Sequence, residues 1–208
     1  AEVGIAACYL GDAAKASEAA ARIEALLHKG DSSLGWGRLS NLRTLIALLQ
    51  RDYPRVLEEV ERGIVCYINS SYQGNVGYLR NIRGLVLLAQ GQANEAASEF
   101  IAVRKGAAEL RITRLEGFAA LNLAWAQLSQ GHRQAATATA RQAADLLAAS
   151  RARETESAQA LAAACETGEA SAMLQGLRLA MSASKGNPDL YQPSDKVLAD
   201  LATSHTRS

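Results

Sequence analysis

The sequence predicts an all-α protein: a right-handed superhelix of about five antiparallel helix pairs, repeated with a period of about 40 residues. Alanine makes up about a fifth of the chain, and only 3 prolines occur. Aromatic residues make up 5%, a composition that favours helices over a β-sandwich or barrel. Segments one period apart also align without a gap, which is typical of repeat architectures.

The repeat is visible when residues 40–64 are placed over residues 80–104. Leu45 and Leu48 then stand over Leu85 and Leu88. The segment 120–143 continues the same columns. A turn position follows, where glycine would supply the positive φ that ends a helix. The residues at this turn position are Gly11, Arg51, Gly91 and Gly131.

Apolar columns after the turn are spaced by four and then three residues, which describes one face of a second helix. The alanines of these columns let neighbouring helices approach closely, so a large side chain at Ala96 or Ala136 should be overpacked. The first column holds Ala16, Val56, Ala96 and Ala136, and the second holds Ala20, Val60, Phe100 and Ala140.

Each unit is therefore a helix, a short turn and a second helix, with about 15–18 residues in each helix, lengths that need tertiary packing. The units cover about residues 1–30, 36–70, 74–110, 113–150 and 153–184, so the repeat domain spans 1–185. Loop compositions predict long links around 30–36 and 70–75. The tail, 186–208, contains a short helix capped by Ser194 and either folds over the last unit or is mobile.

These columns resemble the tetratricopeptide repeat. That family has a small residue midway along its first helix, as at Gly84 and Ala124 here. It has a glycine at the turn, as at Gly91, and an alanine early in the second helix, as at Ala96. The proline that usually closes the family repeat is missing in every unit, and the spacing exceeds the ordinary ~34 residues.

A spacing near forty and segments such as GLVLLAQGQANEAASEF resemble the superhelical sensor domain of large ATP-dependent LuxR-type transcription regulators, the family of the maltose regulator. The resemblance implies an isolated sensor and interaction domain. The three widely spaced cysteines predict a reducing, cytoplasmic location. That family's nucleotide-binding module and helix-turn-helix are not recognisable in this sequence. The first residues lack a methionine and read as helix, which predicts a piece of a longer protein.

Composition and residue spacing argue against a nucleic-acid-binding protein, a membrane protein, a metalloprotein and an enzyme. The 22 Lys and Arg nearly balance the 21 Asp and Glu, so we expect no direct nucleic-acid contact. No apolar run approaches the ~20 residues of a membrane span. Isolated histidines and cysteines without ligand spacing predict no metal, no cofactor and no enzyme. These residues are His28, His132, His205, Cys8, Cys66 and Cys165.

The candidate binding residues lie on the predicted first helices, which line the concave surface in repeats of this type. An asparagine amide both donates and accepts, so it can hold a peptide backbone irrespective of side chains. An arginine can bind a carboxylate or phosphate. In the alternative interpretation, these residues cap loops or pair with glutamates of adjacent units, and Trp125 belongs to the core. The candidates are Arg38, Asn41, Arg43, Tyr78, Asn81, Arg83, Phe118 and Trp125.

The leading hypothesis is a non-enzymatic domain that binds a peptide, a partner protein or a small inducer in its concave groove. It would be the effector-sensing or interaction part of a bacterial transcription regulator. The alternative is a structural scaffold or oligomerisation domain without a small ligand, which allows a homo-oligomer. That alternative predicts an apolar patch on the convex face or on the end units.

Overall fold

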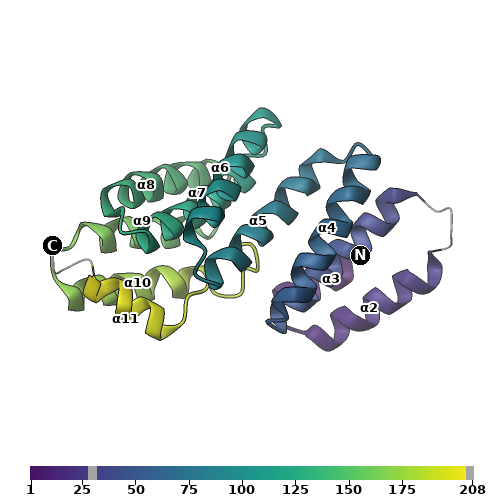
Figure 1. Ribbon diagram of the computed structural model, residues 1–208, viewed down its shortest axis with the longest axis horizontal. Coiled ribbons are helices and arrows are strands. Elements are labelled where there is room, and N and C mark those ends of the chain that lie inside the picture. Colours follow the sequence, from purple (N-terminus) through teal and green to yellow (C-terminus); the bar gives the residue numbers. More distant parts are fainter. Residues whose placement is uncertain (28–31, 205–208) are drawn as a thin grey trace. The chain divides into compact units, whose positions relative to one another are not determined.

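The computed structural model describes residues 1–27 and 32–204, and its regular elements are all helices (Figure 1). This confirms the predicted all-α class for the described part of the chain. His28, His205 and the Gly30–Asp31 part of the first predicted link lie outside the described residues. The helices are α1 (Glu2–Tyr9), α2 (Ala13–Leu26), α3 (Ser33–Leu49), α4 (Tyr53–Asn69), α5 (Gln73–Ala89), α6 (Ala93–Glu109), α7 (Thr113–Ser129), α8 (Arg133–Ala149), α9 (Thr155–Glu166), α10 (Ala170–Ser184) and α11 (Asp195–Ser204).

The chain divides into two compact units. The first contains Ala1–Val86 and Gly186–Pro188, and the second contains Leu87–Lys185 and Asp189–Ser208. In the first unit, α1 packs against α2, α2 against α3, and α3 against α4. In the second unit the same order of neighbours runs from α6 to α11, so each helix packs against the one before it.

Helices α3 to α8 share one length and one spacing. Each has 17 residues, and their first residues are evenly spaced along the chain, at Ser33, Tyr53, Gln73, Ala93, Thr113 and Arg133. The period of the sequence is therefore two equal helices joined by equally short links. The predicted long link at 70–75 is wrong, because only residues 70–72 separate α4 from α5. Helix α3 already begins at Ser33, inside the other predicted link.

The short links are built on one backbone turn that recurs along the chain. After α3, the Arg51 N–H donates to the Leu48 carbonyl at 3.1 Å and the Asp52 N–H donates to the Ala47 carbonyl at 2.9 Å. This pair of bonds defines a Schellman motif, whose central residue is left-handed. The predicted positive φ is confirmed at Gly11, Gly91 and Gly131. Non-glycine residues adopt it at Arg51, Ser71, Arg111 and Arg151, with φ between 54 and 59°.

The small-residue columns of the second helices are buried, as the sequence predicts. Ala16 and Val56 are fully buried in the first unit, as are Ala96 and Ala136 in the second. Close helix approach also explains some glycines within helices. A Cβ added at Gly117 would lie 2.8 Å from a methyl carbon of Leu147, so α7 and α8 meet there without room for a side chain.

The tail folds onto the last helices. Helix α11 packs against α10, beside which it lies in Figure 1. The Val197 N–H donates to the Ser194 hydroxyl at 3.4 Å, which confirms Ser194 as the cap of this helix. Of the two alternatives for the tail, the structure therefore shows the folded one. No helix within residues 1–27 and 32–204 is both long and apolar enough to cross a membrane.

Candidate functional site

Helix α7 is enclosed on most of its surface and carries one buried amide. It packs against α6 and α8, and the residues from Gly117 to Ala126 are buried without interruption. Apolar residues on all sides of a helix are typical of one surrounded by protein. Asn122 lies within this run and is fully buried. A buried carboxamide must find hydrogen-bond partners, since each unsatisfied polar atom destabilises the fold.

Asn122 bonds the backbone of the segment between α10 and α11. Its Nδ2 donates to the Asp189 carbonyl oxygen at 2.8 Å. Its Oδ1 accepts from the Tyr191 N–H at 2.9 Å. The two backbone groups flank Leu190, which is 3% exposed. One side chain thus holds a non-helical segment at two points, and neither bond depends on the identity of the held side chains.

An aromatic contact lies next to this amide pair. The Trp125 ring, one helical turn beyond Asn122, meets the Tyr191 ring edge to face, with the ring centroids 6.0 Å apart. Both side chains are buried. Edge-to-face pairs at this distance are favourable because the positive ring edge meets the negative ring face. Trp125, a candidate groove residue, is therefore covered by an aromatic residue of the chain's own tail.

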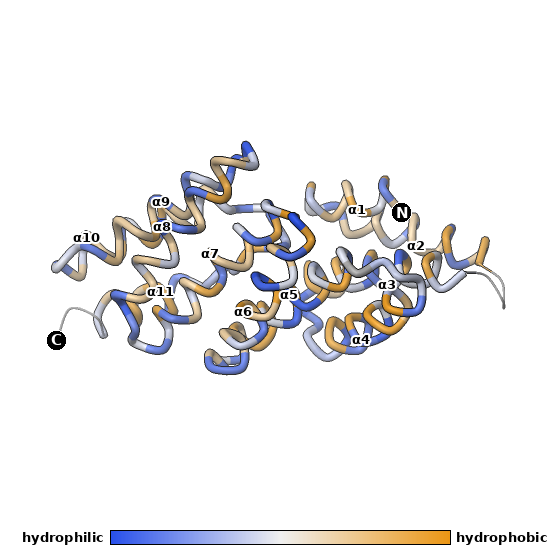
Figure 2. The backbone as a smooth tube through the Cα atoms, turned by 90° about the horizontal axis from the view of Figure 1, so that it is seen from above, coloured by the Kyte–Doolittle hydropathy of each residue, from blue (hydrophilic) through white to orange (hydrophobic). Residues whose placement is uncertain are grey.

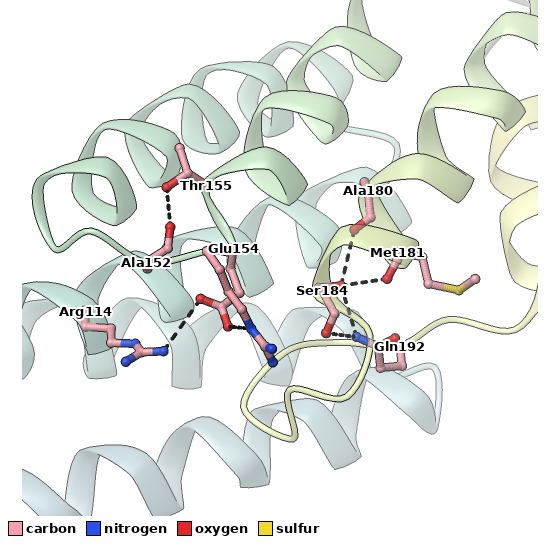
Figure 3. A network of polar contacts seen from close by, with 9 residues as sticks. Arg114, Ala152, Glu154, Thr155, Ala180, Met181, Ser184 and Gln192 are labelled. Carbon is pink, nitrogen blue, oxygen red and sulfur yellow. Dashed lines mark hydrogen bonds and ion pairs between the residues drawn. The ribbon is translucent and has the colours of Figure 1, made fainter. Parts of the chain in front are cut away.

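The segment is also fastened to α10. Gln192 Nε2 donates to the carbonyl oxygen of Ser184 at 3.1 Å and to its hydroxyl at 3.0 Å (Figure 3). The Ser184 hydroxyl lies at 3.2 Å from the Ala180 carbonyl, and Ser157 of α9 donates to that carbonyl at 2.7 Å. Loops normally lie on the surface, because buried backbone groups need partners. The buried residues of this loop are Asn187, Asp189, Leu190, Tyr191 and Pro193.

Charged residues join the beginnings of α7 and α9. Glu154 is 1% exposed, and its carboxylate lies 3.7 Å from the Arg114 guanidinium and 3.1 Å from Arg153 Nε (Figure 3). The Arg114 guanidinium also lies 5.3 Å from the centre of the Phe118 ring, within cation–π distance. Phe118, another candidate groove residue, is buried. These contacts fix the helix starts beside the Asn122 face.

Two of the three candidate arginines of the first unit form ion pairs with the helix that precedes each of them. Arg43 of α3 lies 2.6 Å from Glu24 of α2. Arg83 of α5 lies 2.6 Å from Glu61 of α4. Pairing with a glutamate of the adjacent helix is the arrangement that the architectural interpretation describes. Both glutamates are more than half exposed, so each pair contributes little to stability.

The remaining candidates differ in exposure although their columns are equivalent in sequence. Asn81 is fully buried, whereas Asn41 is half-buried. Arg38 is exposed, and Tyr78 is half-buried. The asparagines at this column therefore do not present their amides to solvent equally. Of these four residues, Arg38 is the most accessible to a ligand.

A shallow pocket of about 410 Å³ lies beside α8 and α9. Arg133 donates to the carbonyl oxygens of Cys165 and Thr167, which satisfies the end of α9. Burial raises the pKa of the Cys165 thiol to about 11, so the thiol is protonated at neutral pH and is a poor nucleophile. The pocket is lined by Arg133, Gln134, Thr137, Cys165 and Glu166. No cluster of three His, Cys, Asp or Glu side chains that could hold a metal occurs among the described residues.

Sequence reasoning missed Asn122 and the segment that it binds. Ile82 stands at the equivalent position of the preceding repeat unit, so the repeat columns do not mark Asn122. One signal was present: Asn122 is the one amide within the apolar stretch 117–126. A polar residue in such a stretch requires a specific partner. The sequence does not indicate that the partner lies in the tail.

Comparisons of the chain with protein-family models, curated proteins and solved structures found no match. The structure supports an all-helical, repeat-like arrangement in which successive helices pack together. The tetratricopeptide and LuxR-type resemblances are carried by the sequence columns alone.

Proposed function

We propose that this chain is a non-enzymatic recognition domain that binds a non-helical peptide segment of a partner protein along its first helices. One observation carries the proposal: the Asn122 amide of α7 holds the Asp189 carbonyl and the Tyr191 N–H of such a segment. The same contacts made to another chain would be peptide recognition. The backbone bonds would tolerate many sequences, and an aromatic contact such as Trp125–Tyr191 would add selectivity.

The proposal includes a right-handed superhelix of stacked helix pairs. Stacked helix pairs bury their apolar faces against their neighbours, and repeats of this kind form a right-handed superhelix with a concave side. The first helices of each pair would line that side and place Arg38, Asn41 and Tyr78 along it, whereas Asn81 is fully buried. Arg43 and Arg83 would then offer charge to a peptide carboxylate only by exchanging Glu24 and Glu61 for it.

We further propose that the partner is an effector, and that the domain is the sensing part of a larger LuxR-type transcription regulator. Support comes from the near-forty spacing and from the GLVLLAQGQANEAASEF segment. The flanking coding sequence tests this directly. An upstream P-loop ATPase and a downstream helix-turn-helix are expected, and flanks that encode neither would overturn the regulator assignment.

The binding proposal is tested by selecting peptides from a displayed random library on the full chain. We expect enriched peptides whose affinity falls at least fivefold when Arg38 or Asn41 is replaced by alanine, with unchanged helical circular dichroism. Asn69→Ala, at the exposed end of α4, is the matched control and should leave the affinity unchanged. Failure to enrich any peptide, or equal affinity in all three variants, would reject this location for the site.

A scaffold or oligomerisation domain is the second candidate, and one observation favours it. Val65 and Ile68, which are 56% and 58% exposed, lie one turn apart in the apolar C-terminal half of α4 (Figure 2). Neighbouring exposed apolar side chains are typical of a contact surface. Sedimentation at increasing concentration should show self-association that Val65→Lys abolishes. A concentration-independent monomer would exclude this candidate.

A further inference from the structure

We infer that the α7 face around Asn122 and Trp125 is an exchangeable peptide site, normally occupied by the chain's own segment 189–193. Its partner in trans would be a short non-helical peptide with an apolar residue followed by an aromatic one. This inference rests on the proposed function and specifies it, because it names the site and the chemistry of the partner. The observation behind it is a buried loop whose backbone is bonded at two points by the side chain of Asn122.

The resident segment defines what a partner must supply. It offers Asn122 one backbone carbonyl and one N–H, which belong to the residues on either side of Leu190. Leu190 is buried, and Tyr191 places its ring against Trp125. A peptide with the same order of groups could make all of these contacts. The Asn122 bonds select the backbone path, and the Trp125 ring selects an aromatic side chain.

The segment can dissociate from α7 while the helices on either side of it stay folded. It lies between the end of α10 at Ser184 and the start of α11 at Asp195. Pro188 and Pro193 have no backbone N–H, so the loop has fewer donors that need a protein partner while it is in place. Gly186, with φ of 81°, supplies a turn beside exposed Lys185. The contacts that release breaks include those with Asn122, Trp125 and Ser184, each of which a partner or water can replace in part.

The resident segment competes strongly because it is tethered. A short linker gives an attached segment an effective concentration in the millimolar range. A free peptide that makes the same contacts must therefore reach millimolar concentrations to displace it. Any change that weakens the resident contacts should lower the concentration of peptide needed, and this change in affinity is the measurable signature of exchange.

The test uses the full chain with Trp36→Phe, which leaves Trp125 as its one tryptophan. The probe is the peptide NPDLYQPS, from residues 187–194, with 3-nitrotyrosine in place of tyrosine. Nitrotyrosine quenches a nearby tryptophan, so binding at α7 lowers the Trp125 emission. A scrambled peptide of the same composition corrects for collisional quenching. Chains with Tyr191→Ala and with Gln192→Ala are titrated beside the parent.

We expect Tyr191→Ala to lower the half-saturating peptide concentration at least tenfold. Gln192 is exposed, so its replacement should preserve the fold and lower this concentration by a smaller factor of two or more. Tyr191→Phe keeps the ring, and Tyr72→Ala removes an exposed tyrosine of the first unit, so both should match the parent. Circular dichroism checks that each variant keeps its helices.

Equal quenching by the scrambled peptide, or no saturable quenching in either loosened variant, would overturn the inference. The two proposals fail differently. A library-selected peptide that binds without quenching Trp125 preserves the recognition function and rejects this site. Specific exchange of the NPDLYQPS peptide, combined with no selected partner peptide, preserves the site and rejects the recognition function.

Discussion

The carboxamide oxygen of Asn122 accepts a hydrogen bond from the backbone N–H of Tyr191, although the two residues are 69 positions apart in the chain. The same amide donates to the Asp189 carbonyl, so one side chain in the middle of a helix fixes the backbone of a distant loop. Helix α11 follows this loop directly. We therefore expect the order of the tail to depend on a residue of α7.

Replacing Asn122 by leucine should destabilise the second unit by about 1–3 kcal/mol. The substitution keeps the side-chain volume similar but removes a donor and an acceptor from two buried backbone groups. Chemical denaturation followed by circular dichroism measures the loss. Gln134→Leu also replaces an amide by leucine, at an exposed position of α8, and as the control it should change stability by less than about 0.5 kcal/mol. Equal stability of the two variants would contradict the role of the amide.

The turn glycine Gly91 and the helix glycine Gly106 should respond oppositely to alanine. A Cβ at Gly91 or at Gly106 would meet no atom within 4 Å, so neither substitution creates a clash. Gly91 has φ of 81°, and an alanine there should cost about 1–2 kcal/mol of backbone strain. Gly106 lies inside α6, where alanine should stabilise by about 0.5–1 kcal/mol. Thermal unfolding of both variants measures whether each substitution raises or lowers the stability.

Arg111 allows the opposite substitution, in which a non-glycine residue with positive φ is replaced by glycine. It adopts the left-handed conformation with φ of 56° at a turn where glycine is absent. Arg111→Gly should leave stability unchanged or raise it by up to about 1 kcal/mol, because glycine adopts positive φ without steric cost. The same measurement on Arg141→Gly, inside α8, is the control and should show a loss. Destabilisation of similar size in both variants would contradict the turn argument.

The sequence predicted the helices well because the information was local and repeated. Ala136 and its equivalents report helix contacts that recur in successive repeat units. Other features carry no local signal. Arginine has no preference for positive φ, so the left-handed turns at Arg111 and Arg151 were not predictable. The boundary between units falls at Val86 and Leu87, inside an apolar stretch of α5 without a change in composition.

The candidate site was only partly predictable, for a similar reason. An asparagine amide that holds a backbone segment is found at Asn122, whereas the repeat pattern predicts it at Asn41 and Asn81. Those residues recur in the repeat, whereas Asn122 does not. Its partner is set by the fold of the tail over a separation of 67 residues, which periodicity cannot report. Trp125 was found because it occupies a repeat column.

The small-residue columns predict a sharp contrast between neighbouring alanines of α8. Ala136 is fully buried, and Ala135 is exposed. Ala136→Leu should cost about 1–3 kcal/mol, because the added atoms must displace packed neighbours. Ala135→Leu should change stability by less than about 0.5 kcal/mol. Urea titration of the two variants decides the matter, and similar midpoints would mean that the helices do not meet closely at this column.

The buried cysteines predict that the stability of the fold decreases at high pH. Burial raises the pKa of Cys8 and of Cys165 to about 11, because the thiolate is desolvated more strongly than the thiol. Folding therefore favours the protonated form. Stability from these groups is complete below the unfolded pKa of about 9 and declines as the pH rises from about 9 to 11.

Alkylation with iodoacetamide tests the same shift. At pH 8 the native chain should react at Cys8 and Cys165 at least tenfold more slowly than the chain in urea, since only the thiolate is nucleophilic. Burial also raises the pKa of the Cys66 thiol, but Cys66 is half-buried whereas Cys8 and Cys165 are buried, so the reagent should reach Cys66 first. Mass spectrometry of peptides identifies the order. Native Cys165 that reacts as fast as in urea would show that the end of α9 is not packed as described.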